Sequence, residues 1–248
     1  MKLSKGKVFL VGAGPGDPEL ITLKALKVLE KAEVILYDRL VNKEILNYAP
    51  KTANIIFVGK EYGKQQETQS KIYDLILEFY KKGMVIIRLK GGDPFIFGRG
   101  AEEVEFLIKN KIEYEIVAGI SSVLSVPIQF NIPLTHRQYS SSIGIVTGHE
   151  DPNKEKKKVK FELLAKAVDT LVILMGLRNL PQIVESLLKG GLPKTTPIAI
   201  IEHGYFPDQK HLTGTLETIV IKAKELGINP PALIIIGKVI NLFVNYSA

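Results

Sequence analysis

The sequence predicts an α/β protein built from two α/β domains with mainly parallel sheets. Short apolar segments of strand character alternate with longer amphipathic segments along most of the 248 residues, a pattern typical of βαβ units. Several of these strands end in loops rich in Gly, Asp and Pro, where parallel sheets bind ligands. The alternation breaks near residues 134–142 and then restarts. We therefore expect domains at residues 1–136 and 137–248.

The first domain is expected to begin with a strand, a glycine loop and a helix. Asp17 and Pro18 fit the N-cap and first helical position of that helix, and its leucines fall on one face. The expected strands cover residues 7–11, 33–37, 55–58, 84–89 and 114–117, and the expected helices cover residues 19–31, 69–80 and 101–109, with a short helical stretch from 119.

The second domain repeats the alternation on a smaller scale. Its expected strands cover residues 143–147, 170–175, 196–201, 210–213 and 232–236, with a helix at 180–188. The charged segment 154–160 is typical of a solvated loop.

Composition excludes several classes of protein. The chain has no cysteine, which excludes disulfides, thiolate metal sites and a cysteine nucleophile. Its four histidines show no metal-ligand spacing, so we expect no metal. No run of 18 uncharged apolar residues is present, and the apolar segment near the N-terminus is too short for a signal peptide. We expect a cytoplasmic protein that does not enter a membrane.

The net charge of +7 favours an anionic partner. Most lysines are expected only to solvate the surface. Arginines are scarcer, and each stands beside a predicted loop, where its planar fork suits carboxylates. They are Arg39, Arg88, Arg99, Arg137 and Arg178.

The most informative stretch lies at residues 88–103. A predicted strand leads into Gly91-Gly92, and Asp93 and Pro94 follow. Paired glycines allow backbone to approach a ligand without an intervening Cβ. Gly100 then opens a helix with two glutamates in its first turn, as the helix dipole favours. An ordinary strand–turn–helix connection without chemistry is the alternative.

The first loop, at residues 12–18, imitates a dinucleotide-binding fingerprint. The third glycine stands at 16 rather than 17, so the G-x-G-x-x-G spacing fails. Pro15 stiffens the loop, and Asp17 would place a carboxylate near the pyrophosphate. These features argue against a nicotinamide cofactor.

Several stretches together resemble the uroporphyrinogen-III C-methyltransferase family of the tetrapyrrole methyltransferases. The matching stretches are residues 11–20, 37–41, 59–60, 88–100, 132–137, 147–149, 174–176 and 231–233. The opening Gly-Pro-Gly-Asp is shared by many tetrapyrrole enzymes, whereas the segment from Gly91 to Arg99 is more particular to this subgroup. The resemblance spans nearly the whole chain.

The resemblance implies a homodimer of two-domain subunits with S-adenosylmethionine in the active-site cleft between the domains. It implies C-methylation of uroporphyrinogen III at C-2 and C-7, giving precorrin-2 through precorrin-1, with S-adenosylhomocysteine as product. The proton acceptor would be Asp38 and the proton donor Lys60. The implied cofactor contacts are Pro15, Gly91, Gly92, Asp93, Ile96, Ser121, Ser122, Met175, Gly204 and Ala232.

The chemistry is consistent with these residues. Methyl transfer needs the donor and acceptor held in line, and an acid/base pair helps the methylated ring to lose a proton. The substrate has eight carboxylates, which we expect Arg39, Arg88, Arg99 and Arg137 to bind. Simpler roles remain open: Asp38 as a helix cap or an ion pair with Arg39, Lys60 as a surface lysine and Met175 as core.

The chain departs from the family pattern at a few positions. Glu61 stands where an arginine is usual, Ser121 where a threonine is usual, and Tyr205 follows Gly204 where a threonine is usual. The alternative functions are methylation of another tetrapyrrole such as a precorrin, methylation of ribosomal RNA, a basic RNA-binding module and a cofactor-binding regulator without catalysis. The lysines are dispersed and no RNA-recognition signature is present, so we expect a tetrapyrrole partner rather than nucleic acid.

Overall fold

A computed structural model describes residues 6–59, 65–150 and 158–242, without the side chains of residues 65–68. The chain divides into two compact units, Met1–Ser121 and Ser122–Ala248. The expected boundary at 136/137 falls inside the second unit. Helix α4 (Ser122–Gln129) explains this, because its buried Val123 and Val126 share a core with Val172 and Ile235 of the second sheet.

The first unit is built on a five-stranded sheet in the order β3-β2-β4-β1-β5. Every pairing between these strands is parallel, which confirms the predicted parallel sheet. The strands are β1 (Lys7–Gly12), β2 (Val34–Tyr37), β3 (Asn54–Phe57), β4 (Val85–Lys90) and β5 (Tyr114–Val117). Their carboxyl ends lie at one edge and carry the loops singled out in the sequence.

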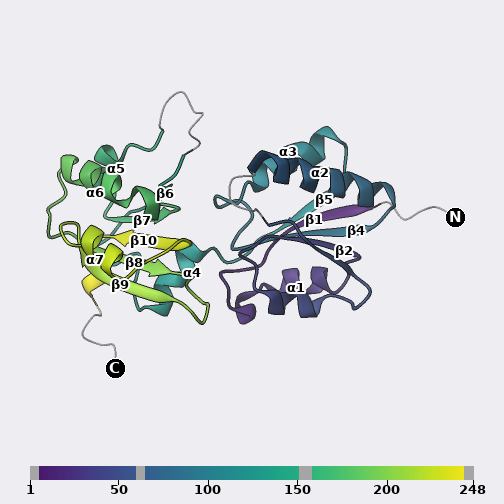
Figure 1. The fold of residues 1–248 in the computed structure, drawn as a ribbon, viewed down its shortest axis with the longest axis horizontal. Coiled ribbons are helices and arrows are strands. Elements are labelled where there is room, and N and C mark those ends of the chain that lie inside the picture. The colour runs from purple at the N-terminus through teal and green to yellow at the C-terminus, as the bar shows by residue number, and fades with distance from the viewer. Residues whose placement is uncertain (1–5, 60–64, 151–157, 243–248) are drawn as a thin grey trace. The chain divides into compact units, whose positions relative to one another are not determined.

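Helices cover both faces of this sheet (Figure 1). Helix α1 (Leu23–Leu29) packs on one face through Ala25, Val28 and Leu29. Helices α2 (Gln65–Lys81) and α3 (Gly100–Lys109) pack on the other, where Ile76 and Leu107 are fully buried. The central strands β1, β2 and β4 are therefore buried on both faces, which accounts for their nearly continuous apolar sequences.

The predicted first helix is divided in two. A 3₁₀ turn, η1 (Pro18–Leu20), is capped by Asp17, whose carboxylate accepts from the backbone N–H of Glu19. The extended backbone of Ile21 and Thr22 then separates this turn from α1. Thr22 is the N-cap of α1, and its hydroxyl accepts from the N–H of Ala25 at 3.2 Å. A further 3₁₀ helix, η2 (Lys43–Tyr48), precedes β3.

The second unit has a mixed sheet in the order β6-β7-β10-β8-β9. Only the β6–β7 pairing is parallel; the β7–β10, β10–β8 and β8–β9 pairings are antiparallel. The prediction of mainly parallel sheets therefore does not extend to this unit. The short connection from β8 to β9 is a reason, since a parallel pair needs a crossover of a dozen residues or more. The strands are β6 (Ile143–Thr147), β7 (Thr170–Leu174), β8 (Pro197–Glu202), β9 (Lys210–Thr215) and β10 (Ala232–Ile236).

Two helices of the second unit were not predicted. Helices α5 (Phe161–Ala167) and α7 (Ile219–Glu225) have seven residues each, too short for a clear periodic signal. Helix α6 (Leu180–Lys189) matches the predicted one, and the 3₁₀ helices η3 (Leu177–Asn179) and η4 (Lys238–Asn241) complete the unit. Most of the predicted loop at 154–160 lies outside the described residues. Among those described, no helix combines the length and apolar character needed to span a membrane.

Candidate functional site

Glycines bring three loops of the first unit into close contact where β1, β4 and β5 end. Gly14 and Gly92 exchange two backbone hydrogen bonds, with N···O distances of 3.2 and 2.7 Å. A Cβ on Gly119 would lie 2.2 Å from the carbonyl oxygen of Gly92, and one on Gly12 would lie 2.5 Å from the Cα of Gly119. A side chain at position 12 or 119 would collide with backbone atoms, so only glycine fits at these two positions. We call Gly12, Gly14, Gly92 and Gly119 the glycine corner.

Asp93 ties the glycine corner together. One carboxylate oxygen accepts from the N–H of Phe95 at 2.9 Å and the other from the N–H of Gly119 at 3.1 Å. The predicted cofactor residues Pro15, Gly91, Gly92 and Asp93 therefore belong to loops at one sheet edge. Pro15 is buried, whereas Ile96 is 39% exposed.

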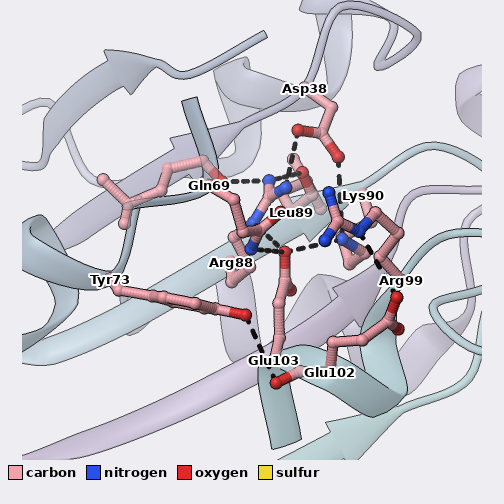
Figure 2. A network of polar contacts seen from close by, with 10 residues as sticks. Asp38, Gln69, Tyr73, Arg88, Leu89, Lys90, Arg99, Glu102 and Glu103 are labelled. Carbon is pink, nitrogen blue, oxygen red and sulfur yellow. Dashed lines mark hydrogen bonds and ion pairs between the residues drawn. The ribbon is translucent and has the colours of Figure 1, made fainter. Parts of the chain in front are cut away.

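A network of charged side chains lies beside this corner, on the sheet face covered by α2 and α3 (Figure 2). Asp38 follows β2, and its Oδ1 accepts from Arg88 Nη2 at 2.6 Å. Arg88 Nε donates to Glu103 Oε1 at 3.2 Å, and Lys90 Nζ donates to the same oxygen at 2.9 Å. Lys90 Nζ also lies 3.9 Å from Asp38 Oδ2. Gln69 of α2 adds a longer contact to Glu103, at 3.4 Å.

Because most of this network is buried, the charges on its side chains affect the pKa values of Lys90 and Glu103. The side chains of Arg88, Lys90 and Glu103 are at most 3% exposed, whereas that of Asp38 is 30% exposed. Burial and the neighbouring Arg88 lower the pKa of Lys90. Burial alone would raise the pKa of Glu103, but Arg88 and Lys90 lower it. The network has two cations and two anions, and only Asp38 reaches solvent appreciably.

The arginines expected to meet substrate have different surroundings. Arg88 is buried and both of its carboxylate partners come from the protein, so its burial argues against the predicted contact with substrate. Arg39, Arg99 and Arg137 are exposed, and Arg99 forms an ion pair with Glu102 at 3.3 Å. The expected donor Lys60 lies outside the described residues.

The cofactor candidates of the second unit gather at one edge of its sheet. Met175 follows β7, Gly204 follows β8, and Ala232 begins β10, which runs antiparallel to both strands. Met175 is 51% exposed, which argues against the alternative of a core methionine. Its φ is +55°, a region that non-glycine residues rarely adopt. His203 and Tyr205, on either side of Gly204, also have positive φ, and such strain concentrates at functional sites.

Ser121 and Ser122 stand at the junction between the two units. Ser121 is 7% exposed, and Ser122 begins α4. In the same helix, the carbonyl of Ser125 accepts from the hydroxyl of Tyr205 at 2.9 Å. Tyr205, the departure noted in the sequence, thus links the Gly204 loop to α4.

Sequence reasoning missed Lys90 and Glu103 as parts of the site. A signal was present, because Arg88 and Lys90 are two residues apart on a central strand and so share one buried face. Two buried cations require buried anions. The glutamates at 102 and 103 were explained by the helix dipole alone, although Glu103 is 1% exposed. No group of three or more His, Cys, Asp or Glu residues suited to a metal occurs within the described ranges.

The fold and site define a class of enzyme. Residues 7–220 match the family of Tetrapyrrole (Corrin/Porphyrin) Methylases, and the chain belongs to this family. Within it, the chain is 52% identical over 236 residues to the uroporphyrinogen-III C-methyltransferase of Priestia megaterium, covering 95% of this chain and 99% of that protein. It is 49% identical to the enzyme of the same name from Methanocaldococcus jannaschii, covering 96% and 98%.

Solved structures of tetrapyrrole methyltransferases have the same fold as this chain. The uroporphyrin-III C-methyl transferase from Thermus thermophilus, complexed with S-adenyl homocysteine, is 39% identical with a TM-score of 0.81, covering 96% of this chain and all of that one. A cobalt precorrin-4 methyltransferase of cobalamin biosynthesis is 25% identical with a TM-score of 0.84, covering 95% and 96%. The fold is therefore shared with enzymes named for different tetrapyrroles.

Proposed function

We propose that this protein is an S-adenosylmethionine-dependent uroporphyrinogen-III C-methyltransferase. It methylates uroporphyrinogen III at C-2 and C-7, forming precorrin-2 through precorrin-1 and releasing S-adenosylhomocysteine. The observation that carries the proposal is similarity over nearly the full length to enzymes of that name, at up to 52% identity among those compared.

The residues of the glycine corner suit the methyl donor. Gly91 and Gly92 carry no side chains of their own to hold a ligand away from the backbone, and Asp93 offers a carboxylate to a cationic, hydroxyl-rich molecule. S-Adenosylmethionine, when bound, supplies an electrophilic methyl group. We assign its binding to Pro15, Gly91, Gly92, Asp93, Ile96, Ser121, Ser122, Met175, Gly204 and Ala232.

Asp38 is our candidate for the base that removes a proton from the methylated ring. It follows β2 beside the glycine-rich turn, is partly exposed, and has its carboxylate fixed by Arg88 at 2.6 Å. A fixed carboxylate loses little orientation entropy on reaction. The sequence left open an ion pair of Asp38 with Arg39; the carboxylate instead pairs with Arg88. Lys60 as proton donor stays a prediction from the resemblance.

The exposed arginines are our candidates for binding the substrate carboxylates. Arg39, Arg99 and Arg137 are exposed, whereas Arg88 is better described as a positioning residue for Asp38. Replacing Arg99 by Ala should raise the KM for uroporphyrinogen III several-fold and leave the Kd for S-adenosylmethionine unchanged. An unaltered KM in all three Arg→Ala variants would remove this assignment.

The decisive experiment is a product assay. The purified protein is incubated with S-adenosylmethionine and freshly reduced uroporphyrinogen III, and the products are weighed by mass spectrometry. The proposal predicts the mass of two added methyl groups and two molecules of S-adenosylhomocysteine for each molecule of product. Turnover only with a precorrin would identify a relative with another substrate, and cofactor binding without turnover on either would indicate a regulator.

The remaining expectations concern assembly and location. We propose a homodimer, which light scattering after size-exclusion chromatography tests directly, and a cytoplasmic protein, as the sequence suggested. RNA methylation is the weaker alternative, and incubation with ribosomal RNA and labelled S-adenosylmethionine should give no transfer.

A further inference from the structure

Glu103 has more contacts than the first turn of a helix requires. Its side chain is 1% exposed, and Oε1 alone accepts from Arg88, Lys90 and Gln69. The other oxygen, Oε2, is buried and has no hydrogen-bond partner in the described part of the chain. An unpaired buried carboxylate oxygen is costly, so a role limited to capping the helix does not account for its position.

Glu103 pairs with the two cations, Arg88 and Lys90, that also lie within ion-pair distance of Asp38. Arg88 spans the two acids, with Nε at 3.2 Å from Glu103 and Nη2 at 2.6 Å from Asp38. Lys90 spans the same two acids at 2.9 and 3.9 Å (Figure 2). Glu103 thus anchors both cations and also balances one of their two charges.

Other groups approach the network from the packed elements. Tyr73 of α2 donates from its hydroxyl to the carbonyl of Glu102, and Glu102 pairs with Arg99 near the start of α3. Tyr73, Glu102 and Arg99 lie closer to the surface. At the centre of the network, the positive charges of Arg88 and Lys90 are therefore balanced by the negative charges of Asp38 and Glu103.

We propose that Glu103 is a positioning residue for proton transfer at Asp38, acting through Arg88 and Lys90. This rests on the function proposed above. In that reaction a C–H bond breaks at the methylene bridge next to the methylated pyrrole, its electron pair neutralises the positive charge that methylation leaves on that pyrrole, and an O–H bond forms on Asp38. Without the charge of Glu103, two buried cations face one carboxylate, and Asp38 accepts a proton less readily.

The test compares Glu103→Gln with Glu105→Gln, a control at an exposed position of the same helix. We expect Glu103→Gln to lower kcat about 10-fold or more and to move the acid limb of the kcat–pH profile about one pH unit lower. The KM values of both substrates should stay within about twofold. The control should leave kcat, KM and the pH profile unchanged. A loss of stability without a shifted acid limb would mean a structural role and would overturn the proposal.

A charge-balanced double variant distinguishes the effect of the negative charge of Glu103 from its role in holding Arg88 and Lys90 in place. It also provides a test if Glu103→Gln does not fold. Lys90→Met/Glu103→Gln removes one cation and one anion and leaves the Arg88–Asp38 pair. We expect its acid limb to return toward that of the wild type while kcat stays low, and an acid limb that stays shifted would contradict the charge argument.

Asp38→Asn is assayed in parallel. Wild-type turnover of that variant would refute the proposed role of Asp38 itself, whereas an inactive Asp38→Asn with a fully active Glu103→Gln would overturn this inference alone.

Discussion

The two units hold their candidate residues at a sheet edge by different means. In the first unit, hydrogen bonds fix the side chains of Asp38 and Asp93 to partners within the parallel sheet and its loops. In the second, backbone conformation is prominent: Met175, His203 and Tyr205 all have positive φ at the ends of strands. Asp38 and Asp93 are therefore sensitive to changes of charge, and Met175, His203 and Tyr205 to changes of backbone shape.

The largest effect is expected from Arg88→Met, which breaks the buried network. It removes one of the two cations paired with Glu103 and the 2.6 Å hydrogen bond to Asp38, and such losses cost about 3–5 kcal/mol. Urea unfolding measures this change. Arg39→Met, at an exposed neighbour of Asp38, should change the free energy of unfolding by less than about 0.5 kcal/mol. Equal losses in the two variants would show that the network contributes little to stability.

Gly119→Ala tests the glycine corner. The new Cβ would lie 2.2 Å from the carbonyl oxygen of Gly92, so the loops must separate, at about 3 kcal/mol. We expect calorimetry to detect no binding of S-adenosylmethionine. Gly227→Ala is the control without a steric clash, because no atom lies within 4 Å of the added Cβ; its φ of +61° adds only backbone strain. It should cost about 1 kcal/mol, and undiminished binding in Gly119→Ala would separate the corner from the cofactor.

Tyr205→Phe tests the second unit with a smaller change. It removes the hydrogen bond from the phenol to the carbonyl of Ser125 and should cost about 1 kcal/mol. The Kd for S-adenosylmethionine should rise a few-fold, because the bond joins the Gly204 loop to α4. Tyr139→Phe, an exposed tyrosine of the same unit, should leave the Kd unchanged. A Kd that rises equally in both variants would not support the link.

Glu115→Gln should have the smallest effect, and its size should depend on pH. Hydrogen bonds from Lys24 and Lys7 lower the pKa of Glu115 to about 2. A lowered pKa in the folded state stabilises the fold above the unfolded value and loses this contribution as the pH falls. The difference from the wild type should be below about 1 kcal/mol at pH 7 and should vanish as the pH falls from about 4.5 to about 2. A difference that grows on acidification would reverse this sign.

Local patterns predicted most elements, but they did not predict the contacts between distant ones. The strands of both units and helices α2, α3 and α6 follow from apolar periodicity and glycine boundaries. The antiparallel pairings of the second sheet did not follow, because strand direction depends on connections whose helices were too short to recognise. Asp38 and Arg88 were both named from the sequence, but for separate roles, and their pairing requires the β2–β4 register, in which Leu36 lies opposite Arg88. No pattern along the chain contains that register.

The bridge between Gly14 and Gly92 also constrains how the protein is made. Its partners are far apart along the chain, and Gly119 must then close against Gly92 and Gly12. Contacts between such distant positions form late, because the loop entropy must be overcome first. A nascent chain released before residue 119 therefore cannot complete the corner, so truncated products of translation should bind no methyl donor.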